Sequence, residues 1–248
     1  VVWSSITYKW TAIIGLAHMD PVFADLRSIT SSADCIHLES WAVGSTDCDP
    51  WSRAYNYPSQ LPAIMSFFGI GYEQTGLIGV LLSAAFVLSW ALLVFVTRPS
   101  GLTVSHVVIN SLALFSPPVL LAVERGNSDL LIFCLLMLAS FSLIRGLDFF
   151  GGGLLVVAAS LKLFPIGAII AFLFTEKKRR LLRATVILSA VLMALALNLE
   201  EWLIIAQVNP RAGFGGGFGA SVLFAEFFAA LSIDSSYLAQ ICGAGIFI

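Results

Sequence analysis

The chain has 248 residues, of which 58% are hydrophobic and 11% charged, and its formal net charge is −2. Soluble domains carry about 25% charged residues, so this composition excludes an ordinary soluble protein and indicates an integral membrane protein. No P-loop, HExxH or CxxC motif supports an ATPase, a zinc protease or a thioredoxin-like protein. We expect no bound metal, no cofactor and no nucleic-acid partner.

Residues 18–74 form a long polar stretch, which we expect to be an extracytoplasmic loop. Within it, residues 58–71 are apolar but too short to cross a bilayer, so they predict an interfacial helix. Cys35 and Cys48 lie in the same stretch. In an oxidising compartment they could form a disulfide, and two free thiols are an equal alternative.

Apolar runs close to 20 residues long follow, and they predict an all-α, polytopic bundle of transmembrane helices within residues 76–199. The predicted spans are 76–97, 104–123, 129–144, 151–174 and 183–199. Beyond them, residues 200–235 predict a Gly-rich outer loop with an interfacial helix, and residues 237–248 predict the start of a further span. Because the chain begins with Val1 and ends inside this apolar run, we expect a single transmembrane domain over 1–248 that is incomplete at one or both ends.

The stretch 151–174 is unusual because it contains Lys162 near its middle and Pro165 shortly after. Proline breaks a helix, and a charge at the middle of the bilayer is costly unless it faces protein or water. One interpretation is a single kinked span. The other is a re-entrant hairpin, which places the basic run 176–183 and Arg145 together on the cytoplasmic side. We predict the hairpin, with Lys162 pointing into a cavity.

This topology gathers acids and isolated cations on the extracytoplasmic face, where a lipid-linked sugar phosphate would present its phosphate. Arginine binds phosphate through two parallel hydrogen bonds. A carboxylate can remove the proton from an acceptor hydroxyl while that hydroxyl attacks the sugar, and cations stabilise the departing phosphate. The charges therefore suit sugar transfer from a phosphate donor that stays in the membrane.

Four motifs occur in an order that supports this chemistry. They are FADLRS with Asp25, CDPWSRAYNYPSQL (48–61), SPPVLLAVERGNSDLLIF (116–133) and GGGLLVVAASLKLFPIGAII followed by EKKRR (151–180). Over about residues 20–183 the chain resembles the polyprenyl-phosphate-sugar-dependent glycosyltransferases of the GT-C superfamily, and most of all glycosyltransferase family 87, the bacterial α-mannosyltransferase-like membrane proteins. It departs from that family at Ser59, where a second proline is usual, and at Leu163–Phe164, which separate Lys162 from the proline.

The resemblance implies a GT-C-like fold and assigns roles to residues of this sequence. Asp25 matches the catalytic base of the first outer loop, and Arg125 with Lys162 would hold the donor phosphate. Arg211, in the Gly-rich outer loop, would be a further phosphate contact. The residues expected to contact the substrate are Tyr55, Tyr57 and Asn127.

Each of these residues has a structural alternative. Asp25 could pair with Arg27, and Asp20 is a competing base. Asp49 stands before a proline and favours a turn. Arg125 could instead pair with the adjacent Glu124. The two tyrosines could belong to an interfacial aromatic belt, and the asparagine could cap the helix that follows it.

We expect a membrane glycosyltransferase that moves a hexose, with mannose as the suggested sugar, from a polyprenyl monophosphate to a lipid or glycan acceptor. It would be a multi-pass protein of the bacterial inner membrane, in contact with membrane lipids. A single displacement at the anomeric carbon would invert its configuration. The alternative is a non-catalytic GT-C-like subunit or fragment that packs with other membrane subunits in a larger complex.

Overall fold

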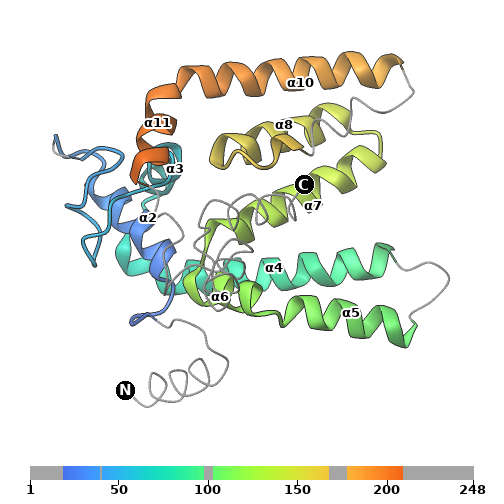
Figure 1. The fold of residues 1–248 in the computed structure, drawn as a ribbon, viewed down its shortest axis with the longest axis horizontal. Helices are drawn as coiled ribbons and strands as arrows, with labels where there is room; N and C mark the ends of the chain where they lie inside the picture. The colour runs from blue at the N-terminus through green and yellow to red at the C-terminus, as the bar shows by residue number, and fades with distance from the viewer. Residues whose placement is uncertain (1–18, 40, 98–102, 168–177, 209–248) are drawn as a thin grey trace, which may run out of the picture.

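The computed structural model describes residues 19–39, 41–97, 103–167 and 178–208, with the backbone alone over 178–186. Within these ranges the chain is helical and contains no strand. Figure 1 shows long helices lying side by side, with shorter helices at one end of them. The predicted all-α class is therefore confirmed for the described residues.

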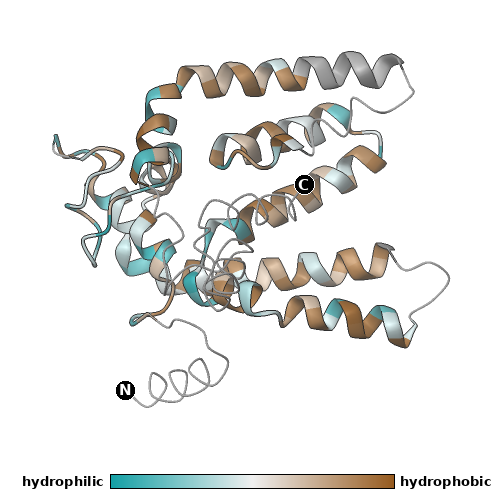
Figure 2. Ribbon diagram, viewed as in Figure 1, coloured by the Kyte–Doolittle hydropathy of each residue, from teal (hydrophilic) through white to brown (hydrophobic). Residues whose placement is uncertain are grey.

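Helix α4 (Thr75–Thr97) is the clearest candidate for a membrane span. It belongs to a helical stretch of 25 residues, Tyr72–Val96, whose most apolar window has a mean hydropathy of 2.5 and is only 11% buried inside the protein. A helix of this length is about 38 Å long, which exceeds the hydrocarbon thickness of about 30 Å. Figure 2 shows apolar residues along almost the whole of α4.

Two further candidates are pairs of helices with a sharp bend between them. Helices α5 (Val104–Leu114) and α6 (Pro117–Arg125) meet at 48°. The second pair is the Ile187–Leu197 part of α10 with α11 (Leu199–Val208), bent by 70°. Among the described residues, one helix is long and apolar enough to cross a membrane, or three if each bent pair is one span.

Both bends have a cause in the sequence. Helix α6 starts with two prolines at its first positions, where a missing N–H is tolerated but α5 cannot continue. At the second bend, Asn198 turns its side-chain amide back to the carbonyl of Ala194 at 2.7 Å. The backbone N–H of Asn198 donates to Leu195, three residues back, instead of four. This local tightening marks the corner between α10 and α11.

The centre of the bundle is formed by α7 (Ser128–Ile144) and α8 (Asp148–Leu161), with α10 (Lys178–Leu197) packed against α8. Small residues allow this close packing: Gly152 of α8 faces Ile187 of α10, and a Cβ at this glycine would overlap the isoleucine side chain. Figure 1 shows α8 and α10 running in the same direction, both starting at the end where α7 meets α8.

Helix α8 ends at Leu161, and Lys162 is extended, with φ −151° and ψ 149°. A helix of 14 residues is about 21 Å long, which is less than the hydrocarbon thickness. The helix break that the lysine and Pro165 predict is therefore present. The second half of the predicted hairpin, together with the side chains of the basic run, lies outside the described residues.

The predicted outer loop 18–74 contains more helix than expected. Helix α2 (Ala24–Cys35) precedes the expected short helix α3 (Gln60–Phe67) and the 3-10 turn η1 (Tyr72–Gln74). Helix α2 is rich in Ser and Thr and is buried on most sides, since every residue from Ser28 to Ala33 is buried. A disulfide joins Cys35, at the end of α2, to Cys48, with 6.3 Å between the Cα atoms.

The predicted outer loop 200–235 also starts differently, because residues 199–208 are helix α11. This helix belongs to the core, where Ile205 is 7% exposed and packs with Leu161 of α8. The remainder of that loop, with its predicted interfacial helix, and the predicted further span at 237–248 lie outside the described residues. Figure 1 shows α11, α3 and α2 at the end of the bundle opposite the α7–α8 turn.

Candidate active site

The connector between α6 and α7 is short and fully specified by its residues. Gly126 ends α6 in the left-handed conformation, with φ 59°, and a pair of backbone hydrogen bonds to Ala122 and Val123 completes a Schellman motif. Asn127 then caps α7, because its Oδ1 accepts from the N–H of Asp129 at 2.9 Å. The turn therefore fixes where Arg125 and Asn127 stand.

The start of α2 is attached to this connector. The N–H of Phe23 donates to the carbonyl of Glu124 at 2.8 Å, and the Phe23 ring lies against Gly79 of α4, where a Cβ would overlap it. A Cβ on Gly126 would come within 3.0 Å of Leu26, so glycine also allows α2 to approach closely. These contacts bring Asp25, in the first turn of α2, next to residues about 100 positions later.

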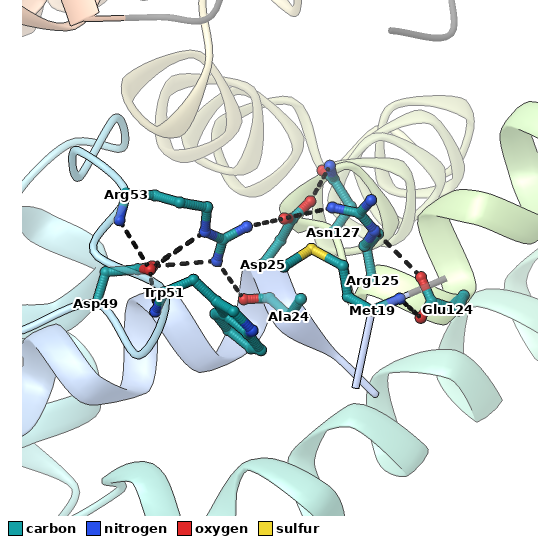
Figure 3. A network of polar contacts seen from close by, with 9 residues as sticks. All are labelled: Met19, Ala24, Asp25, Asp49, Trp51, Arg53, Glu124, Arg125 and Asn127. Carbon is teal, nitrogen blue, oxygen red and sulfur yellow. Dashed lines mark hydrogen bonds and ion pairs between the residues drawn. The ribbon is translucent and has the colours of Figure 1, made fainter. Parts of the chain in front are cut away.

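Both oxygens of the Asp25 carboxylate are held (Figure 3). Oδ2 accepts a hydrogen bond from Nδ2 of Asn127 at 3.0 Å. Oδ1 lies 3.3 Å from Nη1 of Arg53 and 3.8 Å from Nη1 of Arg125. The Asp25 side chain is 17% exposed, so the acid is mostly buried, with two arginines and one amide around it.

Arg53 is fixed by a second carboxylate behind it. Its Nε and Nη2 reach Asp49 at 3.1–3.3 Å, and its guanidinium lies over the ring of Trp51. Burial alone would raise the pKa of Asp49, but hydrogen bonds from Arg53, Ser28 and two backbone N–H groups outweigh it, so the pKa lies below its usual value. The backbone N–H groups of Trp51 and Arg53 both donate to Asp49 Oδ1, which is the predicted turn.

Lys162 reaches the same place from the end of α8. Its Nζ lies 2.6 Å from Asp129 Oδ1 and 3.4 Å from Asn127 Oδ1. The amide of Asn127 therefore lies between the two charges: its nitrogen contacts the acid Asp25 and its oxygen contacts the lysine. The acid, the asparagine and the lysine form one connected chain of polar contacts.

The two tyrosines have different surroundings. Tyr57 lies under the lysine, with Nζ of Lys162 5.8 Å from its ring centre, and burial followed by the charges of Asp25 and Asp129 raises the pKa of its hydroxyl. Tyr55 is 1% exposed and packs in the core between Trp41 and Tyr57. Tyr55 therefore packs against Tyr57 in the core and is not among the described residues that line the cavity reported below.

These side chains surround one cavity of about 870 Å³. Its described lining includes three cations, Arg53, Arg125 and Lys162, and one carboxylate, Asp25. The lining also has apolar residues from the end of α8 and from α11: Leu161, Leu163, Phe164, Trp202, Ile205, Ala206 and Val208. A cavity with more positive than negative charge beside an apolar wall suits an anionic ligand with an apolar part.

The predicted site residues mostly meet. Asp25, Arg125, Asn127, Lys162 and Tyr57 all line the cavity. The competing base Asp20 is exposed and is not among the described lining residues, and Arg211 lies outside the described residues. Arg27 is directed elsewhere, since its Nε donates to the carbonyl of Val22 and its guanidinium lies over the ring of Tyr72.

Arg53 is the member that the sequence reasoning missed. The available signal was the sequence DPWSR, because an aspartate before a proline favours a turn, and such a turn can bring Arg53 back to Asp49. In the described part of the chain, no group of three or more His, Cys, Asp or Glu side chains could hold a metal ion.

The described part of the chain is all-helical, has at least one helix able to span a membrane and has a cation-rich cavity at one end, which defines a helical membrane protein with a polar site. The sequence model of glycosyltransferase family 87 matches residues 55–238, about three quarters of the chain, so the chain belongs to this family. A glycosyltransferase acts on a sugar donor and an acceptor. No curated protein and no solved structure matches the chain.

The family match and the cavity overlap. The matched range includes Tyr57, Arg125, Asn127 and Lys162, while Asp25 lies before it. The predicted family is thus confirmed.

Proposed function

We propose that this protein transfers a hexose, with mannose as the suggested sugar, from a polyprenyl monophosphate to a hydroxyl group of a lipid or glycan acceptor. Asp25 acts as the base, and Arg125 and Lys162 hold the donor phosphate, with Arg211 as a further contact. Tyr57 and Asn127 contact the substrate. The observation that carries the proposal is the polar chain from Asp25 through Asn127 to Lys162 at one cavity.

The chemistry follows from the positions of these charges. A carboxylate has about four lone-pair sites, so Asp25 can accept a hydrogen bond, and then the proton, from the hydroxyl group of the acceptor substrate while it keeps its present partners. The hydroxyl oxygen forms a bond to the anomeric carbon while the bond from that carbon to the phosphate oxygen breaks. The phosphate leaves with the electron pair, and Arg125 and Lys162 stabilise its charge. One displacement inverts the anomeric configuration.

The apolar wall supports a donor with a lipid tail. Leu163 and Phe164 follow Lys162 directly and are 46% and 58% exposed. A phosphate bound by the lysine would therefore have its attached tail next to these side chains. A water-soluble nucleotide sugar has no apolar tail that could contact these two side chains.

We propose the following arrangement in the membrane. The protein is a multi-pass protein of the bacterial inner membrane, with one transmembrane domain over 1–248 and a re-entrant hairpin that breaks at Leu163–Pro165. The outer side carries the loop 18–74 and the segment 200–235. The parallel course of α8 and α10 supports this arrangement, because two parallel neighbours require the chain to return between them.

A non-catalytic subunit of a larger membrane complex is the second candidate. The observation in its favour is that each cation of the cavity already has a carboxylate nearby: Arg53 has Asp49, Arg125 has Glu124, and Lys162 has Asp129. Such pairs also occur in purely structural networks. The distinction is experimental, because an enzyme must turn over substrate.

The test is sugar transfer by the purified chain in lipid nanodiscs, with radiolabelled mannosyl phosphoryl farnesol as the donor and a total bacterial lipid extract as the acceptor. We expect transfer by the wild type and at least a 100-fold loss in Asp25→Asn. The matched control is Asp47→Asn, since Asp47 is an exposed acid of the same outer segment. Transfer that is unchanged in Asp25→Asn removes Asp25 as the base, and no transfer by a folded wild type favours the subunit.

A further inference from the structure

Arg53 makes an unusual number of directed contacts for a residue that is about one third exposed. Nε and Nη2 bind Asp49, Nη2 also donates to the carbonyl of Ala24 at 2.8 Å, and Nη1 donates to Asp25. These contacts use four of the five guanidinium N–H groups. The guanidinium is therefore nearly saturated before any substrate binds.

The partner that fixes Arg53 is itself immobilised. The Asp49 side chain is 2% exposed and accepts from the backbone N–H groups of Trp51 and Arg53 as well as from the guanidinium. The disulfide from Cys48, the residue before Asp49, to Cys35 ties this turn to the end of α2. Asp25 stands at the start of the same helix, so α2, the disulfide, the turn and the Arg53–Asp25 ion pair close a ring.

We propose that Arg53 is a positioning residue that holds the Asp25 carboxylate toward the cavity, and that Asp49 keeps Arg53 in the orientation this requires. The proposal rests on the proposed function, in which Asp25 is the base. It separates the cations of the cavity into two kinds. Arg125 and Lys162 bind the donor phosphate, whereas Arg53 acts on the acid.

The contacts support this division. Arg53 and Asn127 hold different oxygens of Asp25, at 3.3 and 3.0 Å, so together they fix both the position and the plane of the carboxylate. Loss of Arg53 leaves one oxygen with Arg125 alone, at 3.8 Å. A carboxylate freed on one side rotates, and small misplacement of a base is costly for catalysis.

The first test needs no enzymatic activity. Purified variants in nanodiscs are treated with a water-soluble carbodiimide and glycine ethyl ester, and labelling of Asp25 is followed by peptide mass spectrometry. We expect at least a threefold faster labelling of Asp25 in Arg53→Gln and in Asp49→Asn, and a smaller increase in Arg53→Lys. The control is Arg27→Gln, which removes an arginine of α2 that contacts Val22 and Tyr72 and leaves the rate unchanged.

The second test separates positioning from substrate binding. With mannosyl phosphoryl farnesol as the donor, Arg53→Gln should lower kcat at least 30-fold and change KM less than threefold, and Arg53→Lys should restore part of kcat. The dissociation constant of farnesyl monophosphate should stay within threefold of wild type in Arg53→Gln. Thermal melts of each variant confirm that the protein is folded.

Every outcome has a meaning. Unchanged labelling of Asp25 in folded Arg53→Gln overturns the proposal whatever the kinetics show. A raised KM with an unchanged kcat overturns it as well, since Arg53 would then bind substrate, and an unchanged kcat and KM remove its role in transfer. Faster labelling together with a wild type that transfers no sugar supports the placement of Asp25 by Arg53 and rejects the proposed function.

Discussion

The side-chain amide of Asn127 donates to Asp25 across 3.0 Å, although the two residues are separated by 102 positions in the chain. The oxygen of this amide, Oδ1, caps helix α7 and lies 3.4 Å from Nζ of Lys162. One side chain therefore has a structural role at a helix end and a second role between the charges of the cavity. The two roles can be separated by substitution.

Asn127→Ser should separate them. Serine is as good a helix cap as asparagine, so the melting temperature should change by less than about 3 °C. Serine is too short to reach both Asp25 and Lys162, so sugar transfer should fall at least tenfold. Asn127→Ala should lose sugar transfer as well, and because it removes the helix cap it should also lower the free energy of unfolding by about 1 kcal/mol. The cap Thr103→Ala on α5, away from the cavity, is the control for capping alone. Wild-type transfer by Asn127→Ser would refute the bridging role.

Lys162 should contribute to donor binding through its charge. Because a hydrogen bond to a charged group contributes about 1.5–3 kcal/mol, Lys162→Met should weaken the binding of farnesyl monophosphate about 10- to 100-fold. Its partner Asp129 is about half exposed, so the loss of the pair itself should cost little stability. The companion variant Asp129→Asn removes the carboxylate that competes with the phosphate for Lys162, so it should bind farnesyl monophosphate at least as tightly as wild type. Isothermal titration calorimetry in nanodiscs gives both constants.

The sequence predicts several local features of the site, but it does not predict the helix and the long-range contacts that hold the site together. Lys162 and Pro165 in an apolar run predict a break in the helix, because charge and proline are both unfavourable there. The Gly126–Asn127 pair similarly predicts a short connector. Local chemistry decides these features, and the structure has them.

Other features depend on tertiary contacts. Helix α2 escaped prediction because its run of Ser and Thr residues resembles a loop; Thr30 buries its hydroxyl by donating to the carbonyl of Leu26 and contacting Thr75 of α4. Arg53 meets Asp25 only after the chain folds back over 28 residues. Tyr55 and Tyr57 are two residues apart, and only packing decides which of them faces the cavity.

Asp49 should make stability depend on pH in the acid range. Its pKa in the folded protein lies below the ordinary value of 3.8, so its contribution is fully present above that value and is lost as the pH falls through the lower folded pKa. At pH 7, Asp49→Asn should lower the free energy of unfolding by about 1–3 kcal/mol. The difference from wild type should shrink below pH 3.8. Thermal melts at pH 7, 5 and 3 measure it; a gap that stays constant across this range would contradict the linkage.

Ser59 should stabilise the contact between the segment before α3 and helix α11. Its N–H and its hydroxyl donate to the two oxygens of Glu201, at 3.1 and 2.6 Å. Ser59→Ala keeps the first bond, and Ser59→Pro loses both, while its φ of −61° already suits proline.

We expect melting temperatures to fall in the order wild type, Ser59→Ala, Ser59→Pro, with about 1 kcal/mol lost for each bond. Gln60 bonds to Asn198 beside them at 2.8 Å, so Gln60→Ala is a neighbouring control that leaves the serine intact. Equal stability of Ser59→Pro and Ser59→Ala would show that the backbone bond contributes nothing.

The bond between Cys35 and Cys48 also limits where this protein can mature. In the proposed membrane arrangement the segment 18–74 is exported, so the turn from Asp49 to Arg53 acquires its covalent tether only after export, because thiols of the cytosol stay reduced. A host strain that lacks the periplasmic thiol oxidase should therefore produce full-length, membrane-inserted protein in which Arg53 no longer fixes the Asp25 carboxylate. Production for biochemistry accordingly calls for an oxidising export route, with free-thiol titration as the first quality check.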